Sequence, residues 1–234
     1  MVRVTNYGSA PIEYRLKRSS RRTLAISVLP DCTVRVVAPI EADLKEIDDR
    51  VRRRARWILR QQRRFAEFQP RTPARRYVGG ESHRYLGRQY RLKIVRARQN
   101  RVVLRAGRVV VETSNPGDHE VIKKLVRAWV RARANTILRE RFETAISLTA
   151  ALGVRQPPLR VMAMKKRWGS FTKSGNILLN ELLVTAPREC IDYVIVHELC
   201  HAAEPNHSAR FFHLLRRFMP DWERRKELLE RSTI

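Results

Sequence analysis

The chain has 234 residues, and its 49 Lys and Arg against 23 Asp and Glu give a formal net charge of +26. Hydrophobic residues make up 43% of the sequence, which supplies a sizeable core and excludes a wholly disordered chain. No segment approaches the roughly 18 consecutive apolar residues of a membrane-spanning helix. The length predicts one large domain or two small ones.

The first half of the chain predicts mainly strands. Three segments alternate apolar and polar residues, as half-buried strands do: residues 12–18, 24–30 and 33–39. Apolar residues then recur at helical spacing from Glu41 to Phe68, which predicts an amphipathic helix with arginines on its polar face. Residues 69–76 contain two prolines and predict a short linker, and residues 77–113 return to strand patterns.

The second half predicts a long helix, a few short strands and two further helices. The long helix is expected from about residue 119 to residue 152, after a turn at residues 115–118. The remaining expected elements are a strand, a hairpin and two helices, in this order: residues 159–164, 167–183, 187–203 and 208–219. A basic tail follows them.

The charge divides the chain unevenly. Residues 1–117 carry 28 basic and 10 acidic side chains, and residues 118–234 carry 21 and 13. We therefore expect a basic, β-rich N-terminal region over 1–117 and a second region over 118–234. The positive charge attracts polyanions, and the densest arginine run makes Arg52, Arg53 and Arg56 candidates for binding nucleic acid. An arginine-rich genome composition with a solvated basic face explains the same charge.

The chemistry-bearing motif is His197-Glu198-Leu199-Cys200-His201, which reads HExxH. Residues four apart lie on one face of a helix, so both imidazoles can bind one metal ion. Glu198 then projects beside the ion, where it can take a proton from a metal-bound water. Random placement of this composition gives an expected count of about 0.01 for the motif. The alternative is an exposed helix that happens to carry two histidines and a glutamate.

A catalytic zinc site needs three protein ligands and an open position. We expect His207 to be the third ligand, because the turn around Pro205 can bring it back to the metal. The spacing equals that of the metzincin motif, but Glu204 stands at the glycine position of that motif, so the motif does not indicate a metzincin. Three carboxylates remain alternative third ligands: Glu204, Asp221 and Glu223.

The expected hairpin contains a possible substrate-binding strand. An extended peptide can add to the edge of a sheet, and Trp168, Gly169 and Ser170 are the candidates to receive it. Gly169 would permit close approach of another backbone. The alternative places Trp168 in the core and makes Gly169 a bulge.

Long stretches of the sequence resemble the YgjP-like predicted zinc metallopeptidases, which are distant relatives of the SprT-like and WLM proteases. The most specific similarities lie in the second half: MKKRWGSF, APRECIDYVIVHELCH, PNHSARFF and PDWERRKELL. The resemblance implies a zincin-like catalytic region with His197, His201 and His207 on zinc and Glu198 as general base. Phe171 departs from the family pattern, which usually has cysteine there.

We therefore expect an α+β protein whose β-rich N-terminal half precedes a zincin-like catalytic region with an HExxH helix. The expected function is zinc-dependent hydrolysis of protein or peptide substrates. The alternative is a nucleic-acid-associated protein, either a DNA-recruited protease or a binding module whose metal site is not catalytic. Three scattered cysteines and the lack of an apolar leader predict a cytoplasmic protein that does not bind membranes.

Overall fold

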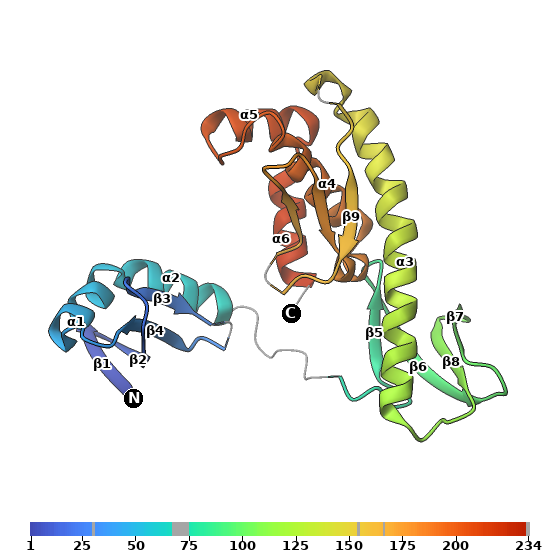
Figure 1. The fold of residues 1–234 in the computed structure, drawn as a ribbon, viewed down its shortest axis with the longest axis horizontal. Helices are drawn as coiled ribbons and strands as arrows, with labels where there is room; N and C mark the ends of the chain where they lie inside the picture. Colours follow the sequence, from blue (N-terminus) through green and yellow to red (C-terminus); the bar gives the residue numbers. More distant parts are fainter. Residues whose placement is uncertain (30, 67–74, 154, 166, 233–234) are drawn as a thin grey trace. The chain divides into compact units, whose positions relative to one another are not determined.

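The computed structural model describes residues 1–29, 31–66, 75–153, 155–165 and 167–232. Its contacts divide the chain into two compact units, Met1–Thr72 and Pro73–Ile234 (Figure 1). The linker expected at residues 69–76 overlaps this boundary, and its residues 69–74 lie outside the described part. Within the described ranges, no helix is long and apolar enough to span a lipid bilayer.

The first unit is a four-stranded sheet with two helices. The strand order is β1-β2-β4-β3, with β2 parallel to β4 and the other pairs antiparallel. Its elements are β1 (Val2–Tyr7), β2 (Ala10–Ser19), β3 (Ala25–Val28), β4 (Val34–Pro39), α1 (Leu44–Arg53) and α2 (Ala55–Ala66). Tyr14 and Val36 from the sheet meet Ile47, Val51 and Ile58 from the helices in one buried cluster.

Two details of this unit differ from the sequence expectation. The sequence pattern does not predict β1. Its apolar residues Val2 and Val4 are exposed and its polar residue Thr5 is buried, which is the reverse of the usual pattern for a half-buried strand. The single expected helix is interrupted at Arg54, whose φ and ψ of −94° and 4° are not helical. Its N–H still donates to the carbonyls of Arg50 and Val51, so the interruption is one residue long.

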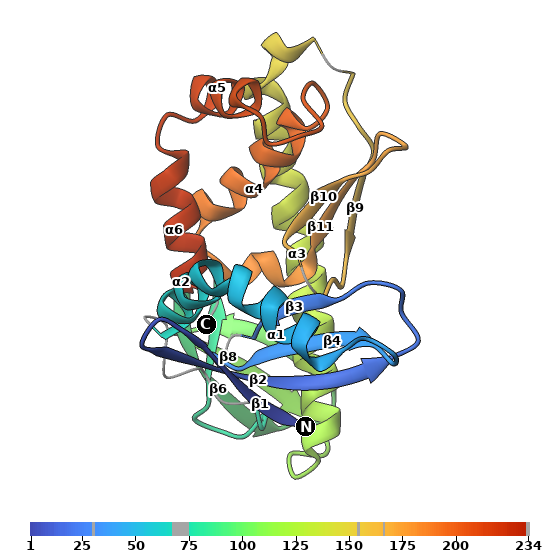
Figure 2. The same cartoon turned by 90° about the vertical axis from the view of Figure 1, so that its left-hand side faces the viewer.

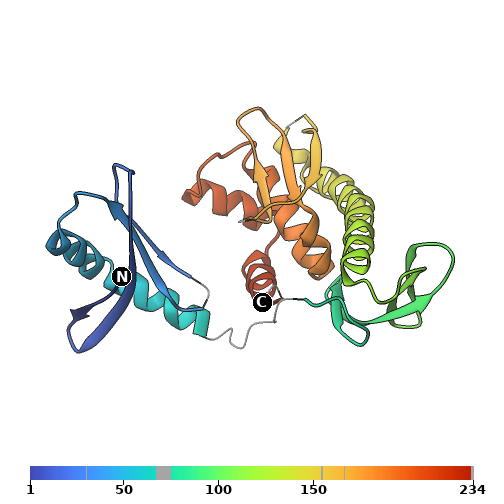
Figure 3. The ribbon, with the colours of Figure 1, turned by 60° about the horizontal axis from the view of Figure 1, so that its bottom comes forward.

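The second unit begins with another four-stranded sheet, in the order β5-β6-β8-β7. Its elements are β5 (Ser82–Tyr85), β6 (Arg88–Arg96), β7 (Arg101–Arg105) and β8 (Arg108–Thr113). The 30-residue helix α3 (His119–Leu148) packs on one face of this sheet through Leu92, Val109, Ile122 and Val126 (Figure 3). This shared core explains why the structural division falls at residue 72 and not at residue 117, where composition and charge had suggested it.

The rest of the second unit surrounds the helix α4. A three-stranded sheet, in the order β10-β11-β9, lies on one side of α4, and α5 and α6 lie on the other (Figure 2). The elements are β9 (Leu159–Met162), β10 (Gly169–Phe171), β11 (Ile177–Asn180), α4 (Arg188–Cys200), α5 (Ala209–Phe218) and α6 (Trp222–Ser232). A 3-10 helix, Glu181–Thr185, joins β11 to α4. The expected basic tail is α6, which buries Trp222 and Leu229, seven residues apart on one face.

The observed architecture confirms the predicted α+β class. The sheets of the first 113 residues precede a region in which short strands and three helices surround the HExxH helix. From Cys190 to Ile195, every residue of α4 except Asp192 is buried. α4 is therefore the central element of the hydrophobic core that surrounds the HExxH motif.

Candidate active site

The two histidines of HExxH lie on the same side of α4, as their spacing predicts. The ring centroids of His197 and His201 are 5.0 Å apart. α4 ends at Cys200 with His201 as its C-cap residue, and the chain turns through residues 202–208 before α5 begins. Ser208 caps α5 by accepting a hydrogen bond from the backbone N–H of Phe211 at 3.3 Å. This turn returns the chain toward the two imidazoles.

His207 joins the two histidines of α4. Its Nε2 atom lies 2.9 Å from Nε2 of His197, and one ligand nitrogen from each of the three histidines fits within 4.8 Å of the others. Phe211 lies beneath all three rings, at centroid distances of 4.9, 4.6 and 4.7 Å from His197, His201 and His207. The structure thus brings the three predicted ligands together on a buried aromatic ring.

The imidazoles have nitrogens available for a cation. Nδ1 of His201 lies 3.0 Å from the backbone carbonyl oxygen of Glu204, which can only accept, so Nδ1 carries the proton and Nε2 has the lone pair. Nδ1 of His197 is buried and has no hydrogen-bond partner among the described residues. The rings of Tyr193, at 5.7 Å, and Phe211 hold His197 in place.

The electrostatics of the site favour the neutral forms of His197 and His207. Burial lowers the pKa of His197 to about 3, and the neighbouring His201 and His207 add to this effect. Burial also lowers the pKa of His207. Nitrogen ligands 2.0–2.1 Å from a tetrahedral metal ion lie about 3.4 Å apart. Three imidazole nitrogens clustered in this way therefore fit a divalent metal ion.

Glu198 is buried next to the histidines, with 8% of its surface exposed. The backbone N–H of Phe171, on β10, donates a hydrogen bond to its Oε2 at 2.7 Å. Burial raises the pKa of Glu198 to about 7, and the hydrogen bond from Phe171 and the charge of Arg167 oppose this rise. A carboxyl with a pKa near neutrality thus lies beside the three imidazoles, and such a group can accept a proton.

Gly169 leaves the space that Glu198 occupies. A Cβ atom on Gly169 would lie 2.8 Å from Cγ and 2.9 Å from Oε1 of Glu198, and 3.0 Å from Val194. The sequence singled out Gly169 for close approach of another backbone. In the structure the group that approaches it most closely is the glutamate of HExxH.

The other two predicted substrate residues lie on or beside the same edge strand. Trp168 is half-buried and packs against the main core of the unit. Ser170 accepts a hydrogen bond from Arg167 at 3.2 Å. The buried side chain of Asn180 fixes this segment, because its amide donates to the carbonyls of Met164 and Arg167 at 2.9 and 3.0 Å.

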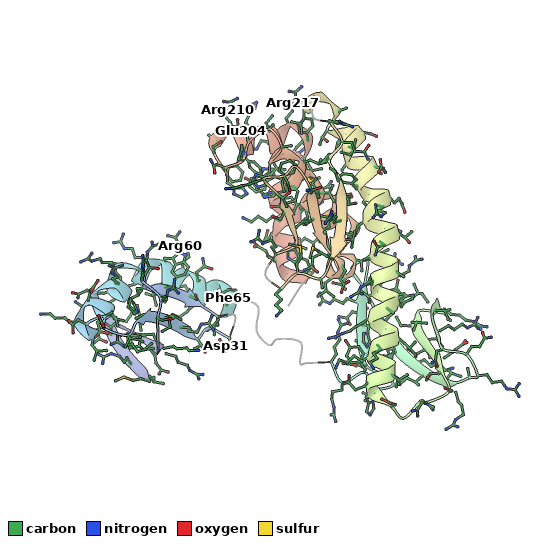
Figure 4. The ribbon with its side chains drawn as sticks, viewed as in Figure 1. Asp31, Arg60, Phe65, Glu204, Arg210 and Arg217 are labelled. Carbon is green, nitrogen blue, oxygen red and sulfur yellow. The ribbon has the colours of Figure 1, made fainter. Side chains whose placement is uncertain are left out.

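The alternative third ligands all contact arginines. Glu204 forms an ion pair with Arg210 at 3.0 Å at the start of α5 (Figure 4). Asp221 accepts hydrogen bonds from Arg225 at 2.9 and 3.0 Å, and Glu223 accepts one from Arg216 at 3.2 Å. Among the described residues, the only cluster with metal-binding geometry is formed by the three histidines.

The predicted nucleic-acid residues belong to the first unit. Arg52 and Arg53 are exposed on α1, and Arg56 is exposed on α2. Arg52 pairs with Asp49 at 3.3 Å, and Nε of Arg56 donates to the hydroxyl of Tyr7 at 2.9 Å. Two of the three arginines therefore have partners within their own unit.

Two contributors to the site have no signal in the sequence. The amide of Phe171 is a backbone group, so its residue type says nothing about its role. Phe211 reads as an ordinary apolar position of an amphipathic helix. Only the HExxH motif followed by a third histidine could have indicated that the ring of Phe211 lies against three imidazoles.

An HExxH helix with a third histidine nearby and a buried glutamate defines a metallopeptidase-type site. The model of the YgjP-like family, metallopeptidase domain, matches residues 22–232. The chain belongs to this family and is a metallopeptidase, which acts on protein or peptide substrates. The recognition made from the sequence motifs is confirmed.

Solved structures similar to parts of the chain are metallopeptidase zymogens. That of abylysin from Pyrococcus abyssi is 27% identical with a TM-score of 0.34, and the similarity covers 39% of this chain and 87% of abylysin. That of jannalysin from Methanocaldococcus jannaschii is 20% identical with a TM-score of 0.37, over 42% of this chain and 90% of jannalysin. No match was found among curated proteins.

Proposed function

We propose that the protein is a zinc-dependent peptidase, with His197, His201 and His207 as metal ligands and Glu198 as general base. One observation carries the proposal: a buried glutamate, hydrogen-bonded to an edge strand, lies beside three imidazoles whose ligand nitrogens cluster within 4.8 Å of one another. Imidazole nitrogens in a set of three are typical ligands of catalytic zinc. A zinc ion in this position supplies a Lewis acid that activates water and polarises a peptide carbonyl.

Glu198 moves the proton in this proposal. Its carboxylate accepts the proton of the attacking water, and its burial gives it a pKa close to neutrality, which suits both uptake and release. It then returns the proton to the nitrogen of the leaving amine. The N–H of Phe171 holds Oε2, so Oε1, next to Gly169, is the oxygen free to carry the proton.

The substrate is proposed to add to β10 as a further strand. β10 is the edge of its sheet, and the backbone groups of Trp168 and Thr172 pair with the β11 hairpin. Gly169 and Phe171 alternate with these residues, so their backbone groups face away from β11. The N–H of Phe171 already binds Glu198, which leaves the two carbonyls and the N–H of Gly169 for an extended peptide.

The test combines metal analysis with a glutamate variant. The wild-type protein should bind one zinc ion per chain and cleave an unfolded protein such as casein. Glu198→Gln should keep the zinc and lose activity by about 10³-fold or more, because general-base catalysis is removed. Glu223→Gln, an exposed glutamate paired with Arg216, is the matched control and should retain both properties. A wild-type protein that takes up no zinc would contradict the proposal.

The cytoplasmic location remains part of this proposal. It is supported by three cysteines that are free in the structure, two of them buried. Measurement of the protein in fractionated cells tests it. The nucleic-acid role of Arg52, Arg53 and Arg56 has no support from the comparisons with known proteins.

A further inference from the structure

The sheet of the second unit has one covered face and one open face. Leu92, Val109 and Val111 point toward α3 and are buried. Because side chains alternate along a strand, their neighbours point to the opposite face. Four basic residues of that face are exposed: Arg91, Lys93, Arg105 and Arg108. Residues 82–113 as a whole contain nine Arg and Lys against one acid.

Three of these arginines form a continuous row across the sheet. Arg91 on β6 is the register partner of Arg108 on β8, and Arg108 is also the partner of Arg105 on β7. Register partners on adjacent strands are about 5 Å apart. We name these residues the arginine row: Arg91, Arg108 and Arg105.

The turn between β7 and β8 fixes this register. Ala106 and Gly107 both have positive φ, 47° and 68°, which is the geometry of a two-residue type I′ hairpin. In such a hairpin the residues flanking the turn must face each other. Arg105 and Arg108 are therefore held side by side by the backbone, independently of any attraction between their side chains.

The row has no ion pair of its own in the described part of the chain, and Glu112, whose pKa is lowered mainly by the hydrogen bond from Arg101, is also affected by the charge of Arg105. Within the described residues, none of its members makes a hydrogen bond or an ion pair through its side chain. Glu112, the acid of these strands, already pairs with Arg101, with Nε 2.5 Å from the carboxylate. Like charges on directly opposite positions destabilise a sheet. Three adjacent guanidinium groups on a fixed surface are therefore arranged for an external anion.

We propose that the open face of the β5–β8 sheet binds the phosphate backbone of a nucleic acid duplex. Guanidinium groups bind phosphate through paired hydrogen bonds, and a duplex presents a continuous line of phosphates to a row of arginines. The apolar residues on this face are Val95, Val103 and Val110, and no aromatic side chain of these strands accompanies them. This face therefore offers no ring on which unpaired bases could stack, but it offers guanidinium groups for contact with the phosphate backbone.

This inference concerns a surface away from the histidines and does not rest on the proposed zinc chemistry. The probe is a fluorescein-labelled mixed-sequence duplex of 20 base pairs, and its anisotropy is followed with the full chain between 50 and 200 mM NaCl. Wild-type binding should weaken steeply with salt. The variant Arg91→Gln/Arg105→Gln/Arg108→Gln should bind at least roughly ten-fold more weakly, with a salt slope reduced by about 2.7, which corresponds to three lost phosphate contacts.

Two further variants make the result specific. Arg52→Gln/Arg53→Gln/Arg56→Gln removes the same charge from the other unit and should leave binding within about two-fold of wild type. Arg91→Lys/Arg105→Lys/Arg108→Lys keeps the charge and should keep the salt slope, which covers the case in which the glutamine variant does not fold. If both glutamine variants lost affinity for the duplex equally, net charge alone would explain the binding and the proposal would be overturned. Tighter binding of polyglutamate than of the duplex, or no binding at 50 mM NaCl, would overturn it as well.

Discussion

The backbone N–H of Phe171 donates to Oε2 of Glu198 at 2.7 Å, so the edge strand β10 directly orients the glutamate of HExxH. The strand and the helix come from segments 27 residues apart. Any displacement of β10 therefore moves the group that we propose as general base, and the peptide bound along β10 would be aligned by the same strand that aligns the base.

Gly169→Ala should separate the positioning of Glu198 from metal binding. The added methyl group would lie 2.8 Å from Cγ of Glu198, so the carboxylate has to shift. Misplacement of a catalytic group by about 1 Å costs on the order of 100-fold in rate, and we expect kcat to fall by about this factor with zinc content unchanged. Gly79→Ala is the control, since nothing lies within 4 Å of a Cβ at Gly79. Unchanged kcat in Gly169→Ala would refute this role of the glycine.

His207→Ala should weaken zinc binding by more than about 100-fold, because it removes one of three ligands. The measurement is competition of the purified protein against a zinc chelator of known affinity. Asp221→Asn serves as the comparison, because Asp221 is occupied by Arg224 and Arg225 and should not affect zinc affinity. If Asp221→Asn weakened zinc binding more than His207→Ala, the carboxylate of Asp221 would be the third ligand and the assignment of His207 would be wrong.

Asn180→Ala should destabilise the protein by about 2 kcal/mol, because it leaves two partly buried carbonyls without donors. The same side chain also accepts the N–H of Leu182 at 3.1 Å and caps the 3-10 helix before α4. Hydrogen exchange should accelerate in residues 167–171, which its amide holds. Asn176→Ala should change stability by less than half as much, because among the described residues the amide of Asn176 donates to the hydroxyl of Ser174 alone.

Asp48 should make the stability of the first unit depend on acid pH. Burial acts to raise its pKa, but the hydrogen bonds from Tyr14 and Arg3 outweigh burial and lower it. A carboxyl with a lowered folded-state pKa stabilises the protein above its unfolded-state pKa, and this stabilisation disappears as the pH falls through the folded-state value.

Asp48→Asn should therefore lower the free energy of unfolding by about 1–2 kcal/mol at pH 7, and the difference from wild type should shrink as the pH falls below about 4. Thermal unfolding at pH 7, 5 and 3 measures this. Asp49→Asn is the control, because its pair with Arg52 is exposed and such pairs contribute little. A difference that is constant over this pH range would show that the charge of Asp48 plays no part.

The helix of HExxH and the cluster of its histidines could be predicted because they depend on spacing within one helix and the turn that follows it. His207 needed only that turn to reach His197. The linker at residues 69–76 could be predicted from its prolines, but the assignment of residues 77–113 to the second unit could not, since it depends on packing of Leu92 and Val109 against Ile122, residues far apart in sequence. Composition and charge do not report such contacts.

The environment of Glu198 could be predicted only in part. The HExxH motif identifies Glu198, and Gly169 could be predicted as a position of close contact because glycine lets another group approach the backbone. It could not identify the approaching group, since the partner of Gly169 is set by how β10 packs on α4. The hydrogen bond from Phe171 is made by a backbone amide, which every residue except proline has.

The ring of Phe211 lies on α5 and the imidazole of His207 lies four residues earlier, in the turn before α5, while the other two imidazoles come at the end of α4. Synthesis proceeds from the N-terminus, so the third ligand and its aromatic support leave the ribosome after both units have most of their strands. On the proposed ligand assignment, a growing chain cannot hold its metal ion with all three ligands until residue 207 has emerged. A growing chain that lacks His207 would then have no peptidase activity, although the strands described within residues 1–180 are already synthesised.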